Sequence, residues 1–195
     1  HVRCHNYCDG TIGVNVAGGV PNIDPSGNPV YTYLWNDVLG QTNSTAIGLC
    51  VNNITNQTTY TCAVTDAQGC TDTISYILEQ PEELIASTEI LDEISCNGYA
   101  DGSISITTTG GTPNYQYSLN GSPLQNASTF NNVSAGQAII DIVDNQGCTE
   151  QLIFNVTEPL PLATIDSFVA QTSIVYDDGS FRISTTGGTP PYTDS

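Results

Sequence analysis

A pattern of turn, strand and glycine-rich turn occurs three times along this chain and constrains its fold more than any other feature. The best preserved copy covers residues 96–113, and the other copies begin at Cys4 and near Asp178. The second and third copies are offset by about 77 residues, a period typical of a tandem array of small domains. The first copy is longer because two polar stretches are inserted, at residues 20–28 and 50–58.

The second copy shows the strand pattern most clearly, because apolar and polar residues alternate in short runs separated by turn residues. Asn120-Gly121 and residues 144–147 have the composition of tight hairpin turns. The sequence predicts strands at 84–94, 103–109, 115–119, 127–133, 137–143 and 149–156, and no stretch has helical periodicity. This density predicts an all-β fold of tandem immunoglobulin-like β-sandwich repeats arranged as a rod.

Proline-containing joins occupy matching positions at Pro81 and Pro159 and divide the chain. We predict repeat 1 at residues 1–81, repeat 2 at 82–159 and an incomplete repeat 3 at 160–195. Proline stiffens such joins, so little slack is expected between neighbours. The third copy contains the first half of a sandwich, so we expect a longer chain or another chain to complete it.

The charge distribution excludes several partners. The chain has no lysine, two arginines and a net charge of −18. Such a surface repels nucleic acids and anionic membranes, so neither is an expected partner. No apolar run has the length of a membrane span. Because lysine is absent, Lys–Asn isopeptide bonds cannot form, and cysteines and hydrogen bonds must supply the mechanical strength.

Seven cysteines in a strand-rich chain predict an oxidising, extracellular compartment. Cys96 and Cys148 are the only cysteines of repeat 2, and Cys4 and Cys70 are their counterparts in repeat 1. We therefore predict Cys4–Cys70 and Cys96–Cys148 disulfides. Cys62 is expected to pair with Cys50, with Cys8 as the alternative partner, which leaves one thiol over.

The repeated Asp-Gly pair at Asp9, Asp101 and Asp178 has two interpretations. The first is structural, because aspartate binds nearby backbone amides and glycine supplies a positive φ before a strand. The second is calcium coordination near the repeat junctions. Residues 24–28 space oxygen atoms like part of a calcium loop but lack its terminal glutamate. No other cofactor is expected.

Catalysis has little support, because the only histidines, His1 and His5, lie at the extreme N-terminus without a nucleophile context. A zinc cluster of His1, Cys4, His5 and Cys8 is a minor alternative. The aromatic residues that recur on one strand are expected to pack in the core, with a sugar-stacking face as the alternative. Candidate N-glycosylation sequons occur at Asn43, Asn53, Asn56, Asn120, Asn126, Asn132 and Asn155.

The order of motifs in repeat 2 resembles the SprB-type repeat. The resemblance rests on Cys96-Asn97-Gly98, Asp101-Gly102-Ser103, the turn at 110–115, the run 144–149 and Thr157-Glu158-Pro159. Repeats of this family occur in tandem in very large cell-surface proteins of Bacteroidetes, including gliding-motility adhesins exported by type IX secretion. The resemblance implies an extracellular, non-catalytic stalk. Asp72-Thr73-Ile74 also resembles the O-glycosylation motif of that phylum, with Thr73 as acceptor.

Three functions follow as hypotheses. The leading one is a structural segment of a long surface adhesin or filament, whose partners are neighbouring repeats of the same chain. The second is a calcium- or glycan-dependent binding module that contacts surface glycans. The third is a filament subunit completed by other copies of the fibre.

Overall fold

The computed structural model describes residues 1–169 and 179–193, and its elements are all β-strands. The chain divides into two compact units. Unit 1 contains His1–Ile85 together with Thr109–Tyr115 and Val143–Thr149, and unit 2 contains the remaining residues. Turns that belong to repeat 2 in sequence are therefore part of unit 1.

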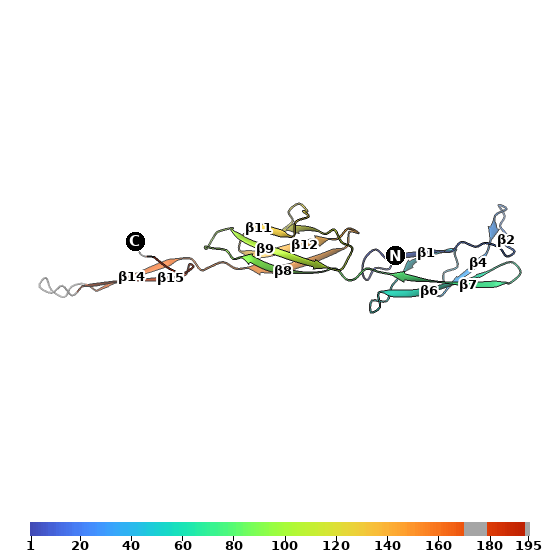
Figure 1. The fold of residues 1–195 in the computed structure, drawn as a ribbon, viewed down its shortest axis with the longest axis horizontal. Helices are drawn as coiled ribbons and strands as arrows, with labels where there is room; N and C mark the ends of the chain where they lie inside the picture. The colour runs from blue at the N-terminus through green and yellow to red at the C-terminus, as the bar shows by residue number, and fades with distance from the viewer. Residues whose placement is uncertain (170–178, 194–195) are drawn as a thin grey trace. The chain divides into compact units, whose positions relative to one another are not determined.

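Unit 1 is built from two antiparallel sheets and a small hairpin (Figure 1). One sheet has strand order β4-β6-β7, and the other pairs β1 with β5. The strands are β1 (Gly10–Gly13), β4 (Thr32–Trp35), β5 (Thr45–Leu49), β6 (Gln57–Thr65) and β7 (Thr71–Glu79), and the hairpin is β2 (Asn22–Ile23) and β3 (Pro29–Val30). The predicted loop insertion at 20–28 thus contributes a two-residue strand to this hairpin.

The core of unit 1 lies between the two sheets, as expected for a β-sandwich. Its buried members come from both layers: Val2, Ile12, Trp35, Ala46, Leu49, Val51, Cys62 and Leu78. Trp35 and Cys62 are direct neighbours across β4 and β6, and Ile12 and Ala46 are neighbours across β1 and β5. The alternation of apolar residues in these strands is what places one face of each sheet inside.

The strands of repeat 2 form two three-stranded sheets, ordered β11-β9-β8 and β10-β12-β13 (Figure 1). Their bounds are β8 (Ile85–Asp92), β9 (Gly102–Thr109), β10 (Gln116–Leu119), β11 (Thr129–Val133), β12 (Gly136–Val143) and β13 (Thr149–Val156). Ile104, Ile140 and Ile142 are almost fully buried. All six predicted strands are confirmed, with boundaries shifted by no more than two residues.

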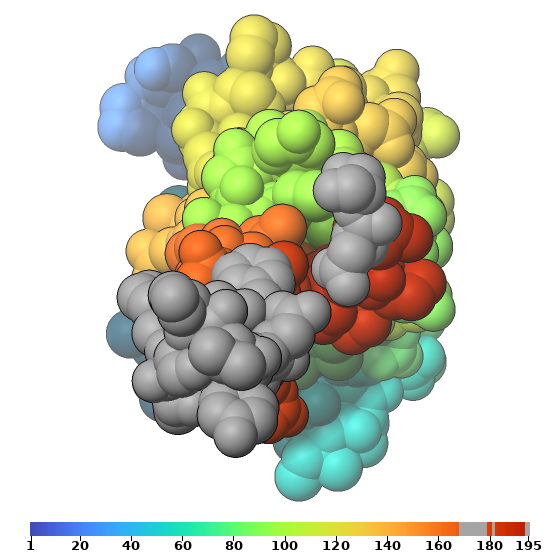
Figure 2. Space-filling model, turned by 90° about the vertical axis from the view of Figure 1, so that its left-hand side faces the viewer, coloured from blue at the N-terminus to red at the C-terminus, as the bar shows by residue number. Residues whose placement is uncertain are grey.

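The last element is a hairpin of β14 (Ala163–Val169) and β15 (Ser180–Thr186). Figure 2 views the molecule from the side of this hairpin, whose orange and red atoms lie together. The all-β class and the immunoglobulin-like sandwich are confirmed, because two antiparallel sheets enclose a shared core. The division at 81, 159 and 195 and the rod arrangement stay predictions. No helix long and apolar enough to cross a bilayer occurs in the part of the chain that the structure describes.

Candidate functional site

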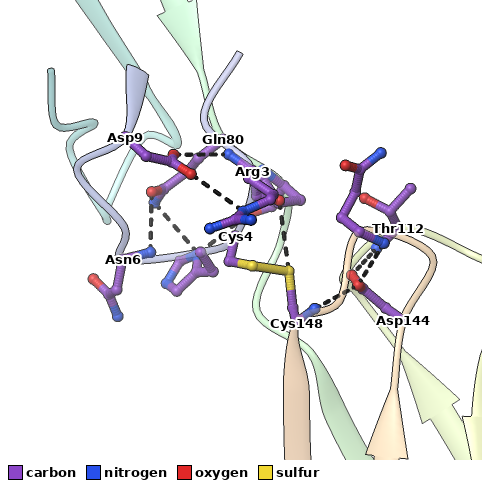
Figure 3. The surroundings of a disulfide bond; sticks show 11 residues. Arg3, Cys4, Asn6, Asp9, Gln80, Thr112, Asp144 and Cys148 are labelled. Carbon is purple, nitrogen blue, oxygen red and sulfur yellow. Dashed lines mark hydrogen bonds and ion pairs between the residues drawn. A yellow bond between two sulfur atoms is a disulfide. The ribbon is translucent and has the colours of Figure 1, made fainter. Parts of the chain in front are cut away.

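A cluster of hydrogen-bonded side chains surrounds a disulfide between Cys4 and Cys148, both within unit 1 (Figure 3). Their Cα atoms lie 5.7 Å apart, and both residues are buried. The bond joins residues that are 144 positions apart in sequence. We call this cluster the stapled junction, because it holds the first loop of repeat 1 against two turns of repeat 2.

On one side, the loop after Val2 is fixed by polar contacts that flank Cys4. The backbone N–H of Arg3 donates to Asp9 Oδ1 at 3.0 Å, and Arg3 Nε lies 3.3 Å from Asp9 Oδ2. The N–H of Asn6 donates to Gln80 Oε1 at 3.1 Å. Gln80 is only 7% exposed, so this loop is held against the join that ends repeat 1.

On the other side, one carboxylate organises two turns (Figure 3). Asp144 Oδ1 accepts the N–H groups of Gln146 and Cys148, each at 2.8 Å. Asp144 Oδ2 accepts the N–H of Thr112 at 2.7 Å. A buried carboxylate needs such donors, and several backbone N–H groups satisfy it well. Asp144 therefore fixes the turn that carries Cys148, which is bonded to Cys4 in the first loop of repeat 1.

The join itself packs on the glycine turn of repeat 2. The N–H of Gly111 donates to the carbonyl oxygen of Glu82 at 2.9 Å. A Cβ atom on Gly110 would lie 1.8 Å from the carbonyl oxygen of Glu83, and Gly110 has a φ of +72°. Both facts require glycine there, because a side chain would clash with the backbone of the join.

The same contacts recur inside unit 2, where repeat 2 meets repeat 3. The N–H of Gly98 donates to Glu158 Oε2 at 2.6 Å, and Asn97 Nδ2 donates to the carbonyl oxygen of Pro159 at 3.1 Å. The N–H of Gly188 donates to the carbonyl oxygen of Leu160 at 2.7 Å. The junction is therefore a repeated structure. Cys96, the counterpart of Cys4, lies in it as an exposed free thiol.

A second disulfide, Cys8–Cys50, covalently links the chain segments at one end of the paired strands β1 and β5. Cys8 precedes β1, and Cys50 follows β5 directly. Gly10 is paired with Leu49, so antiparallel pairing brings the two cysteines together, with Cα atoms 4.1 Å apart. The predicted Cys50–Cys62 bond is wrong, because Cys62 lies in the opposite sheet with its side chain in the core.

The predicted Cys4–Cys70 and Cys96–Cys148 bonds are also wrong. The backbone N–H of Val2 donates a hydrogen bond to the carbonyl oxygen of Glu79, which ends β7. Cys70, in contrast, immediately precedes the start of β7. A nine-residue strand is about 30 Å long, far beyond the span of a disulfide. Likewise, Cys148 immediately precedes β13, whereas Asn97, next to Cys96, is hydrogen-bonded to Pro159 beyond the other end of β13. The two cysteine positions do correspond between repeats 1 and 2, but within each repeat they lie at opposite ends of one sandwich.

Cys62, Cys70 and Cys96 are the free cysteines among the described residues. Burial raises the pKa of the Cys62 thiol. The neighbouring Tyr60 donates its hydroxyl to the carbonyl oxygen of Cys50 at 2.6 Å, a bond like that of the tyrosine corner. Cys62 is thus a core residue, and zinc binding by Cys4 and Cys8 is incompatible with their disulfides.

The Asp-Gly pairs have structural partners where the structure describes them. Asp101 accepts the backbone N–H and the hydroxyl of Ser95, as Asp9 accepts the N–H of Arg3. These bonds, led by the Ser95 hydroxyl, hold the pKa of Asp101 below its ordinary value. Asp178 lies outside the described residues. Within 1–169 and 179–193, no three His, Cys, Asp or Glu side chains form a metal-binding group.

The predicted glycosylation positions lie mostly on the surface. Thr73 is exposed on β7, and the sequon asparagines are exposed except Asn56, which is half-buried. Asn53 and Asn56 accept hydrogen bonds from Gln80 Nε2, each at 3.1 Å. Their side chains thus have structural partners, and the use of any sequon stays a prediction.

Several residues of the junction were not recognised from sequence: Gln80, Thr112, Asp144 and Glu158. The aligned Gln-Pro and Glu-Pro pairs were a usable signal, because one acceptor precedes each proline join. Among the recurring aromatic residues, Trp35 and Tyr117 are buried in the cores, as the packing interpretation expects. Tyr31, Tyr115 and Tyr192 each donate a hydroxyl hydrogen bond to the first glycine of a Gly-Gly turn.

Comparison with known proteins gives one family match and several distant structural matches. The model of the SprB repeat matches residues 88–123, so the chain contains a repeat of that family. No curated protein matches significantly. Among solved structures, an amphioxus IgVJ-C2 molecule matches with 11% identity and a TM-score of 0.34, over 79% of this chain and 99% of that one. The extracellular cadherin domains 1–4 of protocadherin gamma B7 match with 11% identity and a TM-score of 0.28, over 65% and 40%.

Proposed function

We propose that this chain is a non-catalytic, load-bearing segment of an extracellular cell-surface adhesin. The SprB repeat at residues 88–123 supports this class of protein, and the two disulfides fit an oxidising location. The observation that carries the proposal is the stapled junction, because its disulfide changes how tension passes along the chain.

When a chain is pulled from its two ends, force follows the shortest covalent path. With Cys4 bonded to Cys148, that path runs through His1–Cys4, crosses the disulfide and continues from Cys148 onward. The residues between these two cysteines are bypassed and cannot be extended while the bond holds. A stalk that must keep its length under load gains from such a bypass.

The test is to pull single molecules of the full chain from both ends in an atomic force microscope. Reduction of the disulfides is expected to raise the extensible contour length by about 500 Å, since the bond spans 144 residues. The Cys4→Ser variant should also lengthen without reductant, whereas Cys8→Ser should not, because its loop lies within the bypassed segment. Equal lengths for oxidised and reduced chains would overturn the proposal.

The resemblance to the SprB repeat family extends this proposal to a role in gliding or attachment. It also extends the proposal to export by type IX secretion. The calcium- or glycan-dependent module is the competing hypothesis. Glycan binding that EDTA abolishes would favour it over the load-bearing role.

A further inference from the structure

One glutamate side chain holds both reactive groups of an Asn-Gly pair. Glu158 Oε1 accepts a hydrogen bond from Asn97 Nδ2 at 2.9 Å, and Glu158 Oε2 accepts the backbone N–H of Gly98 at 2.6 Å. Asn97 Nδ2 also donates to the carbonyl oxygen of Pro159, at 3.1 Å. Because an asparagine amide nitrogen carries two hydrogens, the Asn97 side chain has no free donor left.

This pair has a chemistry of its own, because asparagine followed by glycine is prone to deamidation. The backbone nitrogen of Gly98 loses its proton and attacks Cγ of Asn97, and the resulting succinimide ring forms as ammonia leaves with that proton. Water then opens the ring to aspartate or isoaspartate. Glycine favours ring closure because it has no Cβ and a flexible backbone. Both residues are exposed, so water reaches them.

The bonds to Glu158 oppose both requirements of ring closure. The Asn97 amide is anchored at two acceptors, so its Cγ is not free to turn toward the nitrogen of Gly98. Loss of the Gly98 proton would place negative charge 2.6 Å from a carboxylate oxygen. Like charges so close repel each other even near the surface. Deamidation of this pair is therefore slow while Glu158 is in place.

The product of deamidation does not restore these contacts. A carboxylate at position 97 has no hydrogen to donate, and it would meet only acceptors, Glu158 Oε1 and the carbonyl oxygen of Pro159. It would also repel the Glu158 carboxylate. Isoaspartate adds a methylene group to the backbone ahead of Gly98 and so displaces the N–H of Gly98 as well. The conversion is therefore one-way for this contact.

The junction of repeat 1 has similar contacts without the labile pair. His5 occupies the position of Asn97, and its Nδ1 lies 3.2 Å from the carbonyl oxygen of Pro81. The backbone N–H of the next residue donates to Gln80 Oε1 at 3.1 Å. Histidine has no amide to lose, so the architecture of a junction does not require asparagine at this position. The labile pair is particular to the contact with Glu158.

We propose that Asn97-Gly98 is a conditional modification site, at which deamidation is blocked while Glu158 holds the pair and proceeds once this contact opens. A prolonged opening becomes permanent, because the carboxylate product excludes Glu158. The chain then carries a lasting chemical mark at a junction that has come apart. The inference rests on these contacts and not on the proposed mechanical role, so it applies to opening by heat, denaturant or force.

The first experiment follows deamidation of the full chain in mildly alkaline buffer by peptide mapping with mass spectrometry. Glu158→Ala should raise the rate at Asn97 about tenfold or more, since it removes two hydrogen bonds to a charged group. Glu89→Ala is the matched control, because Glu89 is an exposed carboxylate on β8 in the same unit. As a surface substitution, it should change the rate less than about twofold.

Asn120-Gly121, a second Asn-Gly pair, is the internal reference in the same samples. Its rate should stay the same in Glu158→Ala, because Glu158 bonds the other pair. In urea, the native chain and Glu158→Ala should deamidate equally at Asn97. An unchanged or lower rate at Asn97 in folded Glu158→Ala would show that the carboxylate gives no protection, and the inference fails. It also fails if Asn120 accelerates equally, since the overall fold would then supply the protection.

The second experiment tests the consequence by amide hydrogen exchange at Gly98, read by NMR. Asn97→Asp imitates one product and should raise the exchange rate about tenfold or more, because the new carboxylate repels Glu158. Asn97→His introduces the residue of the first junction and should keep the native exchange rate without deamidating. Native exchange in Asn97→Asp would contradict the one-way character of the site. Neither readout depends on the extension measured under force, so this inference and the proposed function can fail separately.

Discussion

Asp144 accepts the backbone N–H of Thr112 through one carboxylate oxygen and that of Cys148 through the other, at 2.7 and 2.8 Å. One side chain thus joins the glycine turn of repeat 2 to the turn that carries the disulfide. Asp66 does the same in repeat 1, where its Oδ2 accepts the N–H of Val20 and its Oδ1 that of Cys70. The aspartate that accepts these two N–H groups is therefore a feature that recurs in repeats 1 and 2.

Asp144→Ala should destabilise the chain by about 3 kcal/mol, because it leaves the buried N–H of Cys148 and the partly buried N–H groups of Thr112 and Gln146 without an acceptor. Urea denaturation measures the loss. Asp141→Ala is the control, since Asp141 accepts one side-chain bond, from Gln151, at the surface. It should cost less than about 1 kcal/mol. A similar cost for both variants would contradict the role given to Asp144.

Gly110→Ala and Gly18→Ala form a matched pair. Both glycines have positive φ, at +72° and +87°, so each alanine carries a backbone cost of about 1–2 kcal/mol. Only at Gly110 would the new Cβ also strike the backbone of the join. We expect Gly110→Ala to lower stability by at least about 4 kcal/mol in denaturant titrations. Equal losses would mean that the join does not pack on this turn.

The cysteine assignments predict which thiols react. Iodoacetamide at pH 8 should alkylate Cys70 and Cys96 in the native chain, because both are exposed. Cys62 should react only after unfolding, since burial both shields it and raises its pKa. Peptide mapping by mass spectrometry gives the result. Recovery of a peptide that links Cys4 to Cys70 would contradict the structure.

Removal of the smaller disulfide tests its structural role. The Cys8–Cys50 bond spans 42 residues, and loop entropy assigns it about 4 kcal/mol as an upper value. Cys8→Ser is therefore expected to lower the melting temperature of unit 1, because the bond fastens the sheet of β1 and β5 that covers one side of its core. Circular dichroism during heating measures the change, and Cys70→Ser serves as the control because Cys70 is exposed and unbonded. An unchanged melting temperature in Cys8→Ser would contradict the bond.

Acid should weaken the chain through its turn carboxylates. The backbone N–H of Val20, and then that of Cys70, hold the pKa of Asp66 below its ordinary value of 3.8. A group whose pKa is lower in the folded state stabilises the fold above its unfolded pKa and loses that effect as the pH falls. The melting temperature should thus fall as the pH is lowered through about 4. Asp66→Asn should show a shallower fall, and an identical pH profile would contradict this role.

Much of the fold was predictable from the repeat and the strand pattern. Alternation in residues such as Ile104 and Ile106 depends on local geometry, because successive side chains on a strand point to opposite faces. The turn residues are local as well: Asn120 and Gly121 both adopt positive φ, as the tight-turn pattern requires. Each of these features is determined within a few residues along the chain.

The site was much less predictable, and the cysteines show why. Alignment correctly related Cys4 to Cys96 and Cys70 to Cys148, yet it could not say which cysteines lie close together. That depends on the direction and length of β7 and β13, which place the two members of each pair at opposite ends of a sandwich.

The sequence by itself thus determined the strands, the turns and their repetition, since local backbone preference and side-chain alternation decide them. Only the tertiary structure decided that Cys4 bonds Cys148, because the packing of one repeat against the turns of the next brings them within reach.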